Sequence, residues 1–217
     1  MNILAKFIGL ILLVSLTACS THSKTSSFNS PEEKNRIQIA DETWVALPQP
    51  SELGYTLTAS QLLSVRYIDQ TKKAQSNQLP IQLQITQDKL VLAGFSSWGT
   101  RLLSLSYQDN QFDTYVMAGL GSSLPKPEQV LFNLMITLYP LDVWQPKLQQ
   151  IGWRLTEQQT DDSQLQHSKQ RALFDNHGKL IAEINYASID PLKGDITFIN
   201  HALDFTIVIK TLQYQQD

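Results

Sequence analysis

Residues 89–107 read KLVLAGFSSWGTRLLSLSY, two apolar runs on either side of a short polar stretch. The runs Lys89–Phe95 and Arg101–Tyr107 have the composition of strands, and a glycine on each side encloses Ser-Ser-Trp98. Glycines at such positions favour a turn. The stretch therefore predicts an antiparallel hairpin that carries Trp98 in the connection between its strands.

Period-two alternation of apolar and polar residues continues on both sides of this hairpin. Alternation of this kind is typical of strands with one buried face. The sequence Asp-Asn-His-Gly at 175–178 is a hairpin turn signal. Further strands are expected at Ile81–Thr86, Gln111–Met117, Arg171–Phe174, Leu180–Ala187 and Leu203–Lys210.

One segment has helical spacing. Apolar residues recur every three or four positions after Pro127, a residue suited to a first helical turn, and Pro140 ends the run. A second short helix is expected over Asp142–Gln150, with Pro146 in its first turn or at a kink. We therefore expect a mainly β fold with two helices (α+β): one strongly curved antiparallel sheet, or incomplete β-barrel, capped by the helices.

The N-terminus has the features of an export signal. Lys6 precedes the apolar stretch Phe7–Leu16, which is too short for a stable membrane span, and Leu-Thr-Ala-Cys19 follows. These residues resemble a bacterial lipoprotein signal peptide with its lipobox. The resemblance implies cleavage after residues 1–18 and acylation of Cys19, the only cysteine. The alternative is an ordinary secretory signal with an incidental cysteine.

The segment after Cys19 is polar. Residues 19–36 contain few apolar side chains and predict an acylated flexible tether, and residues 37–217 are expected to form a single domain. Ser20 stands where aspartate typically retains lipoproteins at the inner membrane, so the resemblance implies a lipid anchor at the periplasmic face of the outer membrane. The net charge of −3 and the lack of a basic run argue against a nucleic-acid partner.

Sequence signals of catalysis are missing. His22, His167, His177 and His201 are dispersed, and none has the spacing of a helical zinc site. Cys19 is assigned to lipid. We therefore expect no metal, no cofactor and no enzyme. An enzyme would require His167 or His201 to meet an acid and a hydroxyl in space.

An apolar stripe on the two helices offers candidate ligand contacts. If the helices closed the curved sheet imperfectly, a cavity would remain that suits acyl or polyene chains. The alternative is a packed core, for which such a stripe is also typical. The candidate cavity residues are Leu131, Leu134, Met135, Leu138 and Trp144.

The order of elements resembles the outer-membrane lipoprotein receptor LolB and its relatives. The similarity is carried by the loop Ser96–Gly99 with its following strand, by the helix pair Phe132–Pro140 and Leu141–Leu148, and by the strand Leu203–Thr211. The Leu-rich helix ending at Pro140 and Gly152-Trp153 are also similar to uncharacterised lipoproteins encoded with aryl polyene biosynthesis genes. The resemblance implies a LolA/LolB-like incomplete barrel over a lipid-binding cavity.

The same resemblance implies that the hairpin loop presents an exposed apolar residue. Trp98 occupies that position and is our candidate for contact with the membrane, since tryptophan favours the bilayer interface. The alternative is that Trp98 folds back and seals one end of the barrel.

These observations predict a monomeric, outer-membrane-anchored lipoprotein that binds a hydrophobic (acyl or polyene) chain and aids lipid or lipoprotein placement. Its expected partners are outer-membrane lipid, acylated or polyene cargo, and a periplasmic carrier. The alternative is a non-enzymatic, membrane-tethered assembly or interaction factor with a filled core.

Overall fold

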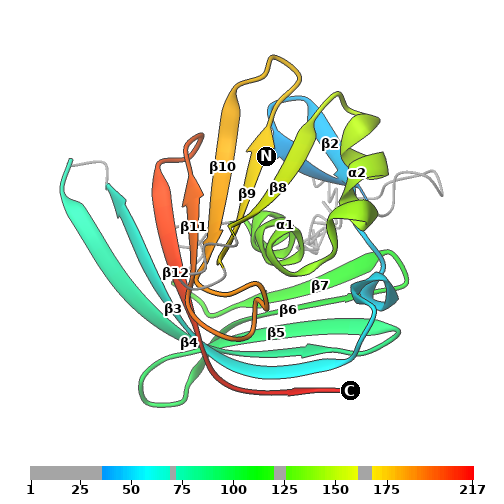
Figure 1. Ribbon diagram of the computed structural model, residues 1–217. Helices are drawn as coiled ribbons and strands as arrows, with labels where there is room; N and C mark the ends of the chain where they lie inside the picture. Colours follow the sequence, from blue (N-terminus) through cyan, green and yellow to red (C-terminus); the bar gives the residue numbers. More distant parts are fainter. Residues whose placement is uncertain (1–35, 69–71, 120–125, 161–167) are drawn as a thin grey trace, which may run out of the picture.

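The computed structural model describes residues 36–68, 72–119, 126–160 and 168–217 (Figure 1). The predicted signal peptide, Cys19 and all but the last residue of the predicted tether lie outside the described residues. That last residue, Arg36, already belongs to a strand.

Ten strands form one antiparallel sheet in the order β7-β6-β5-β4-β3-β12-β11-β10-β9-β8. Two meanders, β3 to β7 and β8 to β12, are joined side by side through β3 and β12. The edge strands β7 and β8 are not paired with each other, and the sheet curves round α1 (Figure 1). The predicted strongly curved, incomplete barrel is confirmed. The strands are β3 Leu57–Ile68, β4 Ala74–Ile85, β5 Lys89–Phe95, β6 Arg101–Gln108, β7 Gln111–Val116, β8 Arg154–Thr160, β9 Ser168–Phe174, β10 Leu180–Tyr186, β11 Ile196–Asn200 and β12 Phe205–Gln216.

The β5–β6 hairpin has the predicted strands, with Leu92 opposite Leu105. Gly94 is required where the hairpin lies against its neighbours. A Cβ added there would lie 3.0 Å from Leu79 Cδ2 and 3.1 Å from Leu103 Cγ. Gly99 has φ of 79°, a conformation that glycine adopts without strain.

Strand β4 is longer than the predicted Ile81–Thr86, and its partner β3 was not expected. The β3–β4 pair extends well beyond β5 (Figure 1). Pro80 lies inside β4. Proline is tolerated there because β5 pairs with β4 only over Ile81–Ile85, so the missing N–H breaks no ladder bond on that side.

Three other expectations are corrected. The last strand begins at Phe205, and Leu203 lies in the preceding turn with 58% of its surface exposed. A two-stranded hairpin, β1 Arg36–Ala40 and β2 Thr43–Ala46, and a 3-10 turn, η1 Pro50–Leu53, were not expected. Their strands are too short to produce a clear alternation.

The two helices are α1 Pro127–Leu138 and α2 Leu141–Gln149. The bounds of α1 agree with those expected from Pro127 and Pro140. Pro146 is inside α2, however, and not in its first turn, because the helix already begins directly after Pro140. Helix α1 lies across the concave face of the sheet, and α2 contacts β8 and β2 (Figure 1).

Candidate functional site

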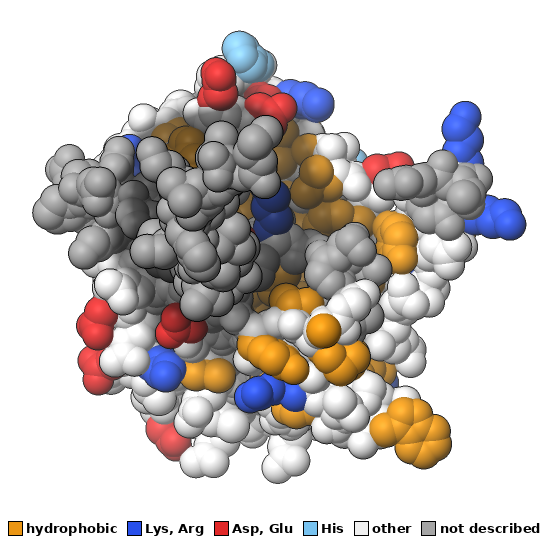
Figure 2. All heavy atoms as spheres, turned by 180° about the vertical axis from the view of Figure 1, so that it is seen from behind, with side chains coloured by type: hydrophobic (Ala, Val, Ile, Leu, Met, Phe, Trp, Pro, Cys, Tyr) orange, Lys and Arg blue, Asp and Glu red, His pale blue; other side chains and the backbone are white. Residues whose placement is uncertain are grey.

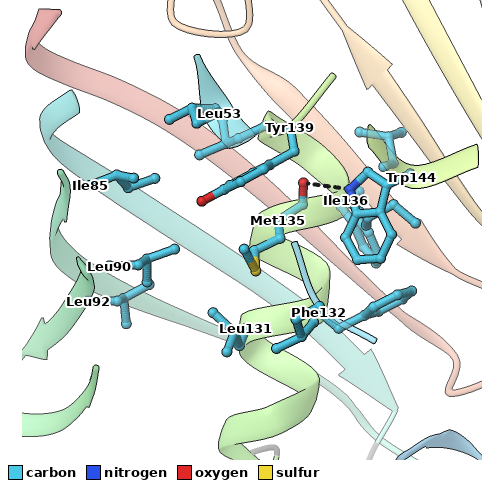
Figure 3. Close-up of a cluster of buried hydrophobic side chains, with 14 of the residues drawn as sticks. Leu53, Ile85, Leu90, Leu92, Leu131, Phe132, Met135, Ile136, Tyr139 and Trp144 are labelled. Carbon is cyan, nitrogen blue, oxygen red and sulfur yellow. Dashed lines mark hydrogen bonds between the residues drawn. The ribbon is translucent and has the colours of Figure 1, made fainter. Parts of the chain in front are cut away.

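The candidate site is the interior between α1 and the concave face of the sheet. Leu131 and Met135 extend from α1 toward Ile85, Leu90 and Leu92 on β4 and β5 (Figure 3). None of the five has more than 3% of its surface exposed. The interface between the helix and this part of the sheet is thus built from aliphatic side chains and a thioether.

The opposite side of α1 is held by aromatic contacts. Phe132 meets Trp144 of α2 edge to face, with ring centroids 5.4 Å apart. Trp144 Nε1 donates a hydrogen bond of 3.2 Å to the carbonyl of Met135 (Figure 3). Trp144 therefore ties the two helices together across the Pro140 interruption.

The structure brings most of the candidate cavity residues together. Leu131, Met135, Leu138 and Trp144 belong to one buried cluster, and Leu134 is partly buried against it. The structure thus presents this interior in a packed state, in which the candidates contact the protein's own side chains.

Pro140 creates a specific problem at the C-terminal end of α1. The proline has no N–H to donate to the carbonyl of Ile136, four residues earlier. Arg171 on β9 supplies the missing donor: its Nη1 lies 2.8 Å from the carbonyl oxygens of both Ile136 and Tyr139. Its Nε pairs with Glu157 Oε2 at 2.7 Å.

A second side chain completes this attachment. Tyr186 on β10 donates from its hydroxyl to the carbonyl of Thr137 at 2.7 Å. Burial raises the pKa of Tyr186, so its phenol stays protonated and remains a donor. We name the side chains of Arg171, Tyr186 and Trp144 the α1 anchor.

The α1 anchor was not identified from the sequence. The strand prediction at Arg171–Phe174 placed Arg171 correctly but gave it no role. The alternation along β9 could have indicated it, because this alternation places Lys169 and Arg171 on the same buried face as Leu173.

The N-terminal half of α1 is attached differently. Within the described ranges, side-chain hydrogen bonds link this helix and the residue after it to other elements only at Met135–Tyr139. Gln129 and Asn133 bond to each other within the helix. The first half of α1 is therefore held by apolar contacts, and its second half by the α1 anchor.

The surface is hollowed on the face shown in Figure 2. Hydrophobic side chains gather in and beside this hollow, and a basic side chain is recessed among them (Figure 2). A separate pocket of about 330 Å³ lies between the ends of β3, β4, β11 and β12 and includes Tyr67, Ile68 and Phe205 in its lining. None of the candidate cavity residues lines that pocket.

Trp98 extends into solvent with 93% of its surface exposed. It does not fold back over the end of the sheet. Its turn is well ordered by hydrogen bonds, since Ser96 Oγ accepts from the backbone N–H groups of Trp98 and Thr100 at 3.3 and 3.1 Å. A large apolar side chain is thus presented at the tip of a hydrogen-bonded turn.

Among the described residues, no three His, Cys, Asp or Glu side chains lie close enough together to hold a metal ion. His201 pairs with Glu183 at 2.8 Å on the outer surface, and His177 lies in the β9–β10 turn. His22 and His167 lie outside the described ranges. No helix within those ranges is both long and apolar enough to cross a bilayer.

Three solved structures resemble the chain, each at 8% sequence identity. A domain from Vibrio parahaemolyticus, described as that of an outer membrane lipoprotein-sorting protein, has a TM-score of 0.37 and covers 75% of this chain and 85% of its own. A DUF1329 family protein from Desulfovibrio piger has a TM-score of 0.34 with the same two coverages. A LolA superfamily protein from Nitrosomonas europaea has a TM-score of 0.40 and covers 78% of this chain and 94% of its own.

None of the curated proteins matches the sequence. A family model, described as a protein of unknown function, matches residues 58–213, from the start of β3 to near the end of β12. The match includes part or all of every strand of the ten-stranded sheet and both helices, so the chain belongs to the DUF3261 family.

Proposed function

We propose that the protein is an outer-membrane lipoprotein, anchored through acylated Cys19, that binds a hydrophobic chain between α1 and the concave sheet. The chain is an acyl or polyene chain, and its binding serves lipid or lipoprotein placement. The observation that carries this proposal is the unequal attachment of α1. Its second half is hydrogen-bonded to the sheet through Arg171 and Tyr186, whereas its first half meets the other described elements through apolar contacts alone.

This attachment allows α1 to act as a cover. The first half of the helix can move away from the sheet without breaking a hydrogen bond to another described element. The hydrophobic chain of the ligand then lies between the sheet and the side chains of Leu131 and Met135, so the apolar surfaces of both the helix and the sheet stay shielded from water. Met135 adapts readily to such a change because its thioether side chain is flexible. Each methylene that leaves water contributes about 0.8 kcal/mol to binding.

A fluorescent C16 fatty acid, titrated into the chain that begins at Ser20, tests the proposal. This form contains every described element. Replacing Leu131 by phenylalanine overfills the side of α1 that faces β5, and we expect roughly tenfold weaker binding. Phe132→Trp is the matched control, because it overfills the neighbouring position toward Trp144 and should leave the affinity unchanged.

Overfilling either position is expected to lower the free energy of unfolding by about 1–3 kcal/mol, so the two variants match in stability and differ in binding. If the parent chain takes up no C16 probe in a saturable manner, the proposed function is wrong.

Trp98 gives a second test, directed at membrane contact. We expect Trp98→Ala to weaken association of the unacylated chain with liposomes roughly tenfold, because burial of a large apolar side chain at the bilayer interface is lost. Trp44→Ala is the control, since Trp44 is also exposed, at 37%, but lies on β2. Equal binding by Trp98→Ala and the parent chain would refute the membrane role of Trp98.

The packed interior favours a second candidate function. Leu131, Met135 and Trp144 have no exposed surface, as expected of a membrane-tethered assembly or interaction factor with a filled core. Native mass spectrometry of the purified protein separates the two functions. Retained lipid supports the carrier, whereas a stable protein partner without lipid supports the interaction factor.

A further inference from the structure

Lys169 occupies an unusual position on the wall that faces α1. Strand β9 alternates between buried and exposed positions, and Lys169 shares the buried phase with Arg171 and Leu173. Only 9% of the surface of Lys169 is exposed. Lysine is rarely buried to this extent unless it is paired with an acid, so its partners require an explanation.

Within the part of the chain that the structure describes, no acid contacts the ammonium group of Lys169. Its Nζ lies 4.4 Å from the ring centroid of Tyr186, which is opposite it on β10. No carboxylate of the described residues lies within 4.0 Å of this ammonium group. Glu157 pairs with Arg171 at 2.7 Å, and Asp190 pairs with Lys193 at 3.5 Å.

The charges on this part of the wall therefore do not balance. Among the described residues, two acids act on Lys169, and each already has its own cation: Glu157 pairs with Arg171, and Asp190 pairs with Lys193, which leaves the charge of Lys169 in excess. Burial lowers the pKa of Lys169, and the nearby Arg171 lowers it further. Glu157 and Asp190 raise the pKa of Lys169 and offset these two effects only in part, so the charged ammonium remains disfavoured at this position. One added negative charge would remove the imbalance.

The position of Lys169 connects it with the proposed ligand. Tyr186, whose ring lies under the ammonium, reaches the carbonyl of Thr137 on α1, and Arg171 reaches those of Ile136 and Tyr139. Lys169 thus borders the contact between the sheet and the attached end of α1.

From this arrangement we propose that Lys169 binds the monoanionic head group of an amphiphile, a carboxylate or a phosphodiester, whose hydrophobic chain lies between α1 and the sheet. This inference rests on the proposed function and specifies its ligand class. Lys169 would donate a charge-assisted hydrogen bond to the head group, and the ring of Tyr186 would support the ammonium from the other side.

The test compares three ligands that share a C16 chain: hexadecanoic acid, hexadecyl methyl phosphate and the neutral hexadecanol. Each displaces a neutral fluorescent probe from the chain that begins at Ser20. Lys169→Met keeps an unbranched side chain over Tyr186 and removes the charge. We expect it to weaken binding of one or both anions roughly tenfold and to leave hexadecanol unchanged. Whichever anion responds identifies the head group.

Two comparisons exclude a merely structural role. Lys169→Arg keeps the charge and should retain the preference for the anion, and Lys179→Met removes an exposed charge and should change nothing. Without ligand, Lys169→Met should melt at the same or a higher temperature than the parent, because a buried unpaired charge is removed.

The outcomes separate this inference from the proposed function. If the parent binds hexadecanol and both anions equally well, the role of Lys169 is refuted while the chain-binding function stands. Equal weakening of all three ligands by Lys169→Met also refutes it. If the parent binds none of them, the proposed function fails and the inference fails with it.

Discussion

Arg171→Met is expected to lower the free energy of unfolding by about 3–5 kcal/mol, as the removal of one partner from a buried ion pair typically does. The substitution removes the donors to the carbonyl oxygens of Ile136 and Tyr139 and leaves Glu157 without its cation. Pro140 cannot supply a replacement donor, because it has no N–H. Since whole domains are stable by about 5–15 kcal/mol, the loss is a large fraction of the total.

Urea denaturation followed by circular dichroism measures this change. Arg154→Met is the control on the neighbouring strand, where the arginine is exposed and lies 4.6 Å above the Phe174 ring. We expect the control to cost at most about 1 kcal/mol. A loss of less than 1 kcal/mol in Arg171→Met as well would mean that Arg171 does not hold the end of α1.

Cys19→Ala is expected to move the protein completely from the membrane fraction to the soluble periplasmic fraction of a bacterium with an outer membrane. The acyl chains on Cys19 are the proposed anchor, and the membrane contact of Trp98 alone is too weak to replace them. Fractionation measures the shift, and mass spectrometry of the N-terminal peptide detects the acyl groups of the parent.

The matched control for this experiment is Trp98→Ala, which keeps Cys19 and should stay in the membrane fraction. Ser20→Asp tests the sorting signal separately and is expected to retain the protein at the inner membrane. If Cys19→Ala remains in the membrane fraction, acylation is not the anchor.

The parts of the fold that were predictable depend on local signals. Pro127 and Pro140 delimit α1 because each restricts the backbone at its own position. The β5–β6 and β9–β10 hairpins follow from turn residues between alternating runs, and both strand pairs are present with their expected partners. Strands β4 and β12 proved longer than their alternation because their partner β3 extends the pairing on both sides.

The candidate site was predictable only in its apolar part. The helical spacing of Leu131 and Met135 identifies a buried face, and burial is observed. Helical spacing does not distinguish a packed core from a surface that binds a hydrophobic ligand, because both require apolar residues at the same positions. The roles of Lys169 and Arg171 depend on where β9 lies relative to the end of α1, and Arg171 is 35 and 32 positions away from its partners Ile136 and Tyr139.

By itself, the sequence established the types and turns of most elements and the place of Trp98 in one turn, since these follow from interactions between residues close together in the chain. Only the tertiary structure established that Arg171 and Tyr186 complete the end of α1. It also established that, among the described residues, the first half of α1 meets other elements through apolar contacts alone and no acid pairs with the buried Lys169. The physical reason is that hydrogen bonding, burial and charge balance depend on which residues meet in space, and curvature of the sheet brings distant strands to the same helix.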